Sequence, residues 1–134
     1  MKIIDVEGIG PAYAEKLKAA GVDTTDELLE AGASRTGREK LADATGLSTG
    51  QLLTWVNHVD LMRFNGVGSE YADLLEAAGI DSCAELAQRN PANLAVTLQE
   101  VVAARPTIVR RVPSEAMVIG WVEQAKDLGK VVTH

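Results

Sequence analysis

Two short glycine motifs contain the residues whose type and spacing could do chemistry. Gly8-Ile9-Gly10 and Gly66-Val67-Gly68 each precede a segment with the apolar spacing of a helix. Glycine adopts the positive-φ or crowded backbone positions that a tight hairpin needs. A hairpin that leads into a helix leaves unpaired backbone N–H groups at the positive end of the helix dipole, and such groups bind phosphate oxygens. Both motifs are therefore candidate phosphate-contact loops.

Basic residues are unevenly distributed around these loops. Lys16 and Lys18 lie one to two turns beyond the first hairpin, whereas Leu74 and Glu76 replace them after the second. Glu70 stands beside the second hairpin, where a carboxylate would repel phosphate. The basic cluster of the chain comprises Arg105, Arg110 and Arg111. Alternatively, the glycines serve only to join two helices, and the arginines belong to a solvated loop.

Four aromatic residues occur in two equivalent pairs. Tyr13 and Tyr71 follow the hairpins at the same distance and could contact a ligand. The interpretation we favour is a half-buried aromatic residue that locks the hairpin to the third helix. Trp55 and Trp121 lie on apolar stripes of helical spacing. We expect these tryptophans in the core or between packed units.

The two hairpins belong to an internal repeat. When residues 8–29 are compared with residues 66–87, at an offset of 58, 11 of 22 positions are identical. Further along, Trp55 and Trp121 correspond at an offset of 66. The second copy therefore carries about eight extra residues, near 101–112. This repeat predicts two duplicated structural units.

Local signals place the helices that would position these residues. We expect a short helix over residues 2–7, a second from Pro11 to about Ala20, and a fourth over 38–45 after a small-residue break at 33–37. Helix starts are predicted after Thr24, Ser48, Ser82, Asn90 and Ser114. Gly129 is expected to end the last helix, with 131–134 as a tail.

The predicted fold class is all-α, with about ten short helices. We predict two tandem five-helix units, residues 1–60 and residues 61–134, that follow one another without a linker and pack together. No long stretch alternates between apolar and polar residues, so no sheet is expected.

Composition limits the possible functions. The net charge is −6 and the pI is near 4.9, which argues against nucleic-acid binding, because phosphate affinity comes mainly from Lys and Arg. The lone cysteine, Cys83, excludes an internal disulfide framework and suits the reducing cytoplasm. We see neither a signal peptide nor a membrane-spanning run, and expect a cytoplasmic protein with no membrane partner.

Catalytic residues are sparse. The two histidines, His58 and His134, are far apart in sequence, and we expect His58 at the surface or at a helix cap. Cys83 follows a helix cap and is interpreted as a small structural residue. No cluster of Cys, His or carboxylate residues has metal-ligand spacing. We therefore expect no enzymatic activity, no metal and no cofactor.

The hairpins resemble the helix-hairpin-helix motif, which contacts the DNA backbone through loop amides without reading bases. The resemblance implies that Gly8, Ile9, Gly10, Gly66, Val67 and Gly68 are the contact residues. The whole chain also resembles a group of bacterial proteins catalogued as a domain of unknown function. The shared blocks are Gly-Ile-Gly-Pro-x-Tyr-Ala-Glu-x-Leu from Gly8, Leu-Leu-Glu-Ala-Ala-Gly from Leu74, and Glu-Leu-Ala-Gln-Arg-Asn-Pro from Glu85.

Two functions remain open at this stage. The first is sequence-independent nucleic-acid binding through hairpin amides, assisted by Lys16, Lys18 and the three arginines. The second is an acidic protein-interaction or scaffolding module whose hairpins are structural. The first requires a positive surface around both hairpins, and the second predicts acidic or apolar surroundings. The known role of the helix-hairpin-helix motif slightly favours nucleic-acid binding over the protein-interaction module. The sequence leaves the oligomeric state open.

Overall fold

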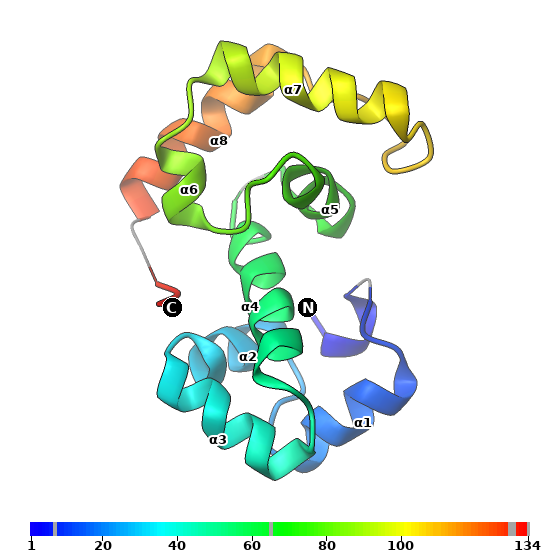
Figure 1. Cartoon of the computed structure of the whole chain (residues 1–134), viewed down its shortest axis with the longest axis vertical. Helices are drawn as coiled ribbons and strands as arrows, with labels where there is room; N and C mark the ends of the chain where they lie inside the picture. The colour runs from blue at the N-terminus through cyan, green and yellow to red at the C-terminus, as the bar shows by residue number, and fades with distance from the viewer. Residues whose placement is uncertain (7, 65, 129–130, 134) are drawn as a thin grey trace. The chain divides into compact units, whose positions relative to one another are not determined.

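The computed structural model describes residues 1–6, 8–64, 66–128 and 131–133, and within these ranges the secondary structure is helical (Figure 1). The helices are η1 (Ile3–Asp5), α1 (Pro11–Ala19), α2 (Thr25–Gly32), α3 (Arg35–Thr45), α4 (Thr49–Leu61), α5 (Ser69–Ala77), α6 (Cys83–Ala87), α7 (Pro91–Ala104) and α8 (Glu115–Leu128). The all-α prediction is confirmed, although the expected first helix is only a 3-10 turn. Gly129 and His134 lie outside the described residues. No helix in these ranges is long and apolar enough to cross a membrane.

The chain divides into two compact units, each with its own apolar core. Unit 1 contains described residues 1–60 and 131–133, and unit 2 contains described residues 61–128. Fully buried side chains of unit 1 include Ile3, Leu17, Leu28, Leu52 and Val56. Those of unit 2 include Leu61, Leu74, Leu75, Ile80, Leu86, Leu98 and Val118. Burial of each such side chain contributes about 1.5–3 kcal/mol, which makes these clusters the main source of stability.

Helix starts are set by local side-chain caps. Thr24 accepts from the N–H of Glu27 at 3.1 Å, and the Glu27 carboxylate accepts from the N–H of Thr24 at 3.1 Å. This reciprocal pair is a capping box and confirms the predicted start of α2 after Thr24. The predicted caps at Ser48, Ser82, Asn90 and Ser114 are also confirmed.

The start of α3 differs from the prediction. The helix begins at Arg35 rather than at residue 38, because Ser34 accepts a hydrogen bond from the N–H of Gly37 at 3.0 Å and caps it. Gly37 therefore lies in the first helical turn and does not break it. A Cβ at Gly37 would stand 2.1 Å from the carbonyl oxygen of Ala31, so the close approach of α2 requires glycine there.

A buried cation joins α3 to the end of the chain. Arg38 is 4% exposed, and its Nη1 donates to the carbonyl oxygens of Gly32 and Ala33 at 2.8 and 3.1 Å. Its Nη2 donates to the carbonyl oxygen of Thr133. Burial lowers the pKa of the Arg38 guanidinium from its ordinary value, Arg35 lowers it further, and Glu39 opposes both effects. Carbonyl oxygens thus replace the water that the buried guanidinium has lost.

Residues 131–133, expected to form a tail, are part of unit 1. Val132 is 2% exposed and lies in the apolar core of that unit. The N–H of Thr133 donates to the carbonyl oxygen of Ala33 at 2.8 Å. The expectation of a tail is therefore wrong for this segment, because so few residues show no periodicity from which burial could be recognised.

Replacement of Arg38 by methionine should lower the free energy of unfolding by about 2 kcal/mol, because it removes the buried donor that serves the carbonyl oxygens of Gly32, Ala33 and Thr133. Urea denaturation followed by circular dichroism measures this loss. Arg35→Met is the matched control, since the Arg35 side chain is 79% exposed and pairs with Glu39 on the helix surface. We expect the control to change stability by less than about 0.5 kcal/mol. Equal losses in the two variants would contradict a structural role for the Arg38 hydrogen bonds.

Candidate functional site

The first glycine hairpin connects η1 to α1. Gly8 has a φ of 85°, a left-handed conformation that favours glycine. Ile9 is 2% exposed, and its N–H donates to the carbonyl oxygen of Val6 at 3.1 Å. Gly10 is the N-cap of α1, with φ −80° and ψ 177°. The middle residue therefore anchors the loop in the core, while both glycines are exposed.

The second hairpin, which leads into α5, has the same construction. Gly66 has a φ of 84°, and Gly68 is the N-cap of α5 with φ −93° and ψ −172°. Val67 is 5% exposed, and its N–H donates to the carbonyl oxygen of Phe64 at 3.2 Å. The Ile9 and Val67 amides, which the resemblance implies as ligand contacts, both donate within the fold, so we do not assign them to a ligand. The N–H groups that can face a ligand belong to the helical turn that follows each hairpin.

An aromatic pair supports each hairpin from within its own unit. The ring centroids of Tyr13 and Trp55 are 5.2 Å apart at 60°, and those of Tyr71 and Trp121 are 5.4 Å apart at 53°. Both tryptophans are buried, as predicted for core residues. A Cβ added to the first glycine of either hairpin would lie close to the Nε1 atom of the tryptophan in the same unit. The distance from a Cβ at Gly8 to Nε1 of Trp55 would be 3.9 Å. The tyrosines thus pack on these tryptophans, which lie on α4 and α8.

The two hairpin helices, α1 and α5, differ from the other described α-helices in their N-cap residues. In six of the eight, a Ser, Thr or Asn side chain accepts from the N–H of the first turn. These capping residues are Thr24, Ser34, Ser48, Ser82, Asn90 and Ser114. The N-caps of α1 and α5 are Gly10 and Gly68, which have no side chain that could accept. The first turns of α1 and α5 therefore lack the usual internal acceptor.

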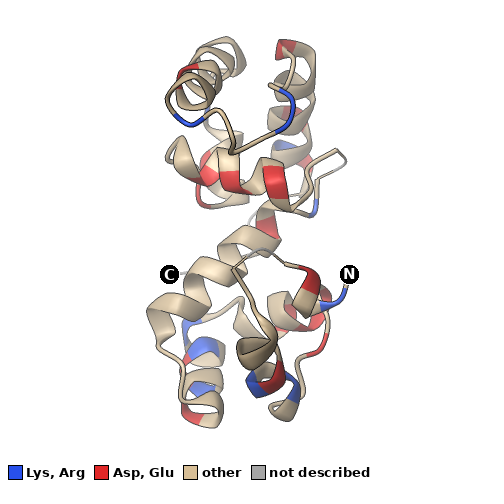
Figure 2. Ribbon diagram, turned by 90° about the vertical axis from the view of Figure 1, so that its right-hand side faces the viewer, with Lys and Arg blue, Asp and Glu red and all other residues tan. Residues whose placement is uncertain are grey.

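The predicted lysines are exposed on α1. Lys16 and Lys18 both face solvent, and Lys18 lines a surface hollow together with Lys2, Glu15 and Asp23. The charge in that hollow is therefore mixed. Figure 2 likewise shows acidic and basic residues on both units. A positive surface around the first hairpin depends on a few lysines among carboxylates.

The three predicted arginines lie in the segment between α7 and α8 of unit 2, and all three are exposed. The N–H and Nε of Arg110 both donate to the carboxylate of Glu70, with an Nε–Oε2 distance of 3.2 Å. The hydroxyl of Tyr71 donates to the carbonyl oxygen of Arg111 at 3.1 Å. The structure therefore brings this basic segment to the first turn of α5, a contact that the sequence analysis missed.

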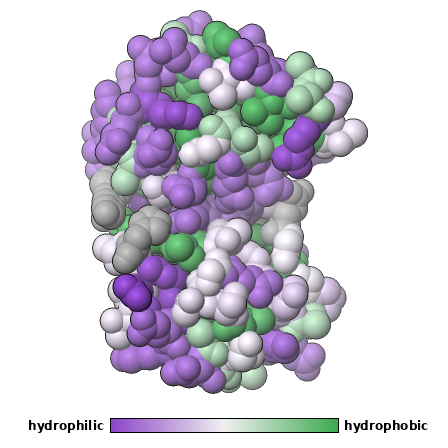
Figure 3. Space-filling model, in the orientation of Figure 1, coloured by the Kyte–Doolittle hydropathy of each residue, from purple (hydrophilic) through white to green (hydrophobic). Residues whose placement is uncertain are grey.

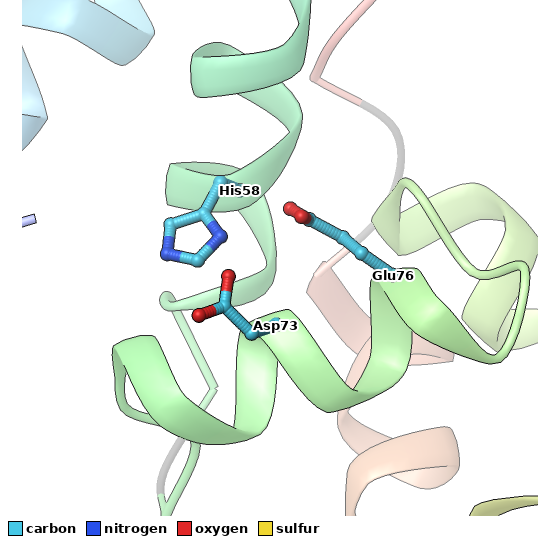
Figure 4. A group of neighbouring side chains, drawn as sticks. All are labelled: His58, Asp73 and Glu76. Carbon is cyan, nitrogen blue, oxygen red and sulfur yellow. The ribbon is translucent and has the colours of Figure 1, made fainter. Parts of the chain in front are cut away.

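Two residues considered for catalysis are buried. His58 is 3% exposed, so its predicted place at the surface or a cap is wrong. Cys83 is fully buried, as expected for a small structural residue, and its Sγ lies 3.5 Å from the carbonyl oxygen of Ala125. Figure 4 draws His58, on α4, with Asp73 and Glu76, on α5. His58 belongs to unit 1 and both carboxylates belong to unit 2, so we assign them no shared role.

Comparison with known proteins places the chain in a family. A family model described as "Domain of unknown function (DUF4332)" matches residues 7–128, which include both hairpins and the arginine segment. The chain belongs to the DUF4332 family. Neither the curated proteins nor the solved structures gave a match.

Proposed function

We propose that this DUF4332 protein is a non-enzymatic helix-hairpin-helix protein that binds the nucleic-acid backbone without reading sequence. One observation supports the proposal. Among the eight described α-helices, α1 and α5 alone have glycine at the N-cap in place of a capping side chain. Each of these helices offers unsatisfied N–H groups and a positive dipole end next to an exposed loop. A phosphate oxygen supplies the acceptor that the other helices obtain from Ser, Thr or Asn.

The donors in this proposal are the amides of the first helical turn. On α1 they belong to Ala12 and Tyr13, because Pro11 has no N–H. On α5 they belong to Glu70 and Tyr71, in the first helical turn. An added Cβ at Gly10 or Gly68 would meet no atom within 4 Å, so the approach to both turns is open. Each hairpin therefore suits one phosphate group.

Side-chain charge adds to these amides on both units. Lys16 and Lys18 supply exposed cations on α1, and the arginine segment supplies Arg110 beside α5, with Arg105 and Arg111 exposed in the same segment. Local positive charge of this kind attracts phosphate even when the net charge of a protein is −6. We expect only modest affinity, because the positive residues are few.

The second candidate is an acidic protein-interaction or scaffolding module. It is favoured by the net charge of −6 and by exposed apolar side chains such as Met1 and Val96, which are 59% and 53% exposed. On the face shown in Figure 3, each unit carries hydrophobic areas among hydrophilic residues. Under this alternative, the glycines serve only to shape the hairpins.

Fluorescence anisotropy with labelled DNA duplexes of about 20 base pairs and unrelated sequence separates the two functions. The proposal predicts equal affinity for the different sequences, and at least a tenfold loss of affinity between about 50 and 200 mM salt. Salt acts this way because each phosphate contact releases condensed counterions. Absence of binding at the lowest salt concentration would exclude the nucleic-acid function and favour a protein partner.

A further inference from the structure

The arginine segment between α7 and α8 is anchored, not loosely solvated as one interpretation of the sequence held. Val109 is 5% exposed and belongs to the core of unit 2. Arg110 donates twice to Glu70, and Arg111 accepts from the hydroxyl of Tyr71. The segment is thus fixed to unit 2 through a buried side chain and through two consecutive residues of α5.

These anchors leave the cationic group accessible. The Arg110 side chain is 95% exposed, whereas that of Glu70 is 30% exposed. The backbone N–H and Nε of Arg110 are used by the carboxylate, so its terminal amino groups remain for a ligand. Since Glu70 lies in the first turn of α5, the arginine is presented where the helix amides are uncapped.

The first hairpin provides an internal comparison. Ala12 stands at the position equivalent to Glu70, and Tyr13 at that of Tyr71. In unit 1, α3 ends at Thr45 and α4 begins at Thr49, so the long arginine segment has no counterpart there. The carboxylate and the arginine segment therefore occur together in unit 2 and are both missing from unit 1. This joint occurrence indicates that the Glu70 carboxylate holds the arginine segment in place.

We propose that Glu70 is a positioning residue that holds Arg110 beside the second hairpin as a contact for a nucleic-acid phosphate. The inference rests on the proposed function and reverses the simple expectation for Glu70. A carboxylate alone would repel phosphate, whereas here its charge is paired with the exposed guanidinium of Arg110. The second hairpin thus uses an arginine where the first relies on lysines of its own helix.

Two opposite predictions follow for Glu70→Ala. If Glu70 only repels phosphate, its removal strengthens DNA binding. If it positions Arg110, its removal weakens binding and makes the slope of log affinity against log salt less steep by about one, as expected for the loss of one phosphate contact. Arg110→Ala should show the same two changes. The double variant should lose no more than Arg110→Ala alone, because both substitutions remove one contact.

Glu123→Gln is the matched control for charge, because Glu123 is an exposed carboxylate on α8 of the same unit. The salt slope of this control should equal that of the unsubstituted protein. Thermal melting by circular dichroism checks that each variant is folded. Should Glu70→Ala destabilise unit 2, Arg110→Ala still tests the contact, because its side chain is almost wholly exposed.

Limited proteolysis with trypsin tests the anchor without DNA. Cleavage after Arg110 and Arg111 should be faster in Glu70→Ala than in the unsubstituted protein or Glu123→Gln, because the segment is released. Unchanged cleavage would overturn the positioning role. If the unsubstituted protein binds DNA and Glu70→Ala binds equally well or more tightly, this inference alone fails. If the unsubstituted protein binds no DNA, the proposed function fails as well.

Discussion

Aspartate at both Gly10 and Gly68 is expected to abolish DNA binding while both units remain folded. The two glycines have extended backbone conformations that any residue can adopt, and their added Cβ atoms would meet nothing within 4 Å. Aspartate is a preferred N-cap, so its carboxylate would accept from the amides that we assign to phosphate. The same carboxylate would repel the DNA backbone.

The expected loss is large because two sites are blocked together. A hydrogen bond to a charged group contributes about 1.5–3 kcal/mol, so loss of both sites should raise the Kd by more than about 100-fold. Stability should be unchanged or increase by a few tenths of a kcal/mol, since Asp replaces Gly at an N-cap. Anisotropy titration measures the first effect, and urea denaturation the second.

Gly50→Asp with Gly120→Asp is the control for added charge. It also adds two negative charges, one in each unit, at glycines with open space around the Cβ that lie within α4 and α8. This control should reduce affinity only slightly. An equal loss in both double variants would show that overall charge, rather than the hairpin amides, controls binding.

Substitution of either buried tryptophan by alanine should cost its own unit about 3–5 kcal/mol of unfolding free energy. Trp55 and Trp121 are 6% and 2% exposed, and each also contributes an aromatic pair of about 0.5–1.5 kcal/mol. The loss is a large share of the total, because domains are stable by only about 5–15 kcal/mol. The substitution should also remove the ring contact between the tryptophan and the tyrosine that follows the hairpin.

Urea denaturation can follow the two units separately. The chain has two tryptophans, so in Trp55→Ala the remaining fluorescence comes from Trp121 and reports on unit 2. Circular dichroism reports on both units, and its early transition should belong to unit 1. Tyr13→Phe keeps the aromatic ring and should cost less than about 0.5 kcal/mol. A loss below 1 kcal/mol in both tryptophan variants would contradict their role as hairpin supports.

Local features of the fold could be predicted from the sequence because their causes lie within a few residues. The N-caps at Thr24 and Asn90 each act on an N–H group three residues away. Gly8 and Gly66 were recognised because a tight hairpin needs positive φ. Among the described helices, the side-chain cap that was missed is Ser34, because Gly37 was taken as a sign of a break although it lies inside the first turn of α3.

Features that depend on distant residues could not be predicted. The contact between Glu70 and Arg110 joins residues 40 positions apart, and that between Arg38 and Thr133 joins residues 95 apart. Charged or polar residues are expected at the surface by default, so the burial of Arg38 and His58 was not anticipated. The hydrogen bond from the Ile9 N–H to the carbonyl oxygen of Val6, which removes this amide from the candidate contacts, could be recognised only in the three-dimensional structure.

The central claim is that amides in the first turns of α1 and α5 contact phosphate. Two-dimensional ¹H–¹⁵N nuclear magnetic resonance of the labelled protein, titrated with a short DNA duplex, tests it most directly. The largest amide shifts are expected at Ala12, Tyr13, Glu70 and Tyr71, and small shifts at Ile9 and Val67. Shifts confined to other surfaces, with these first-turn amides unchanged, would contradict it.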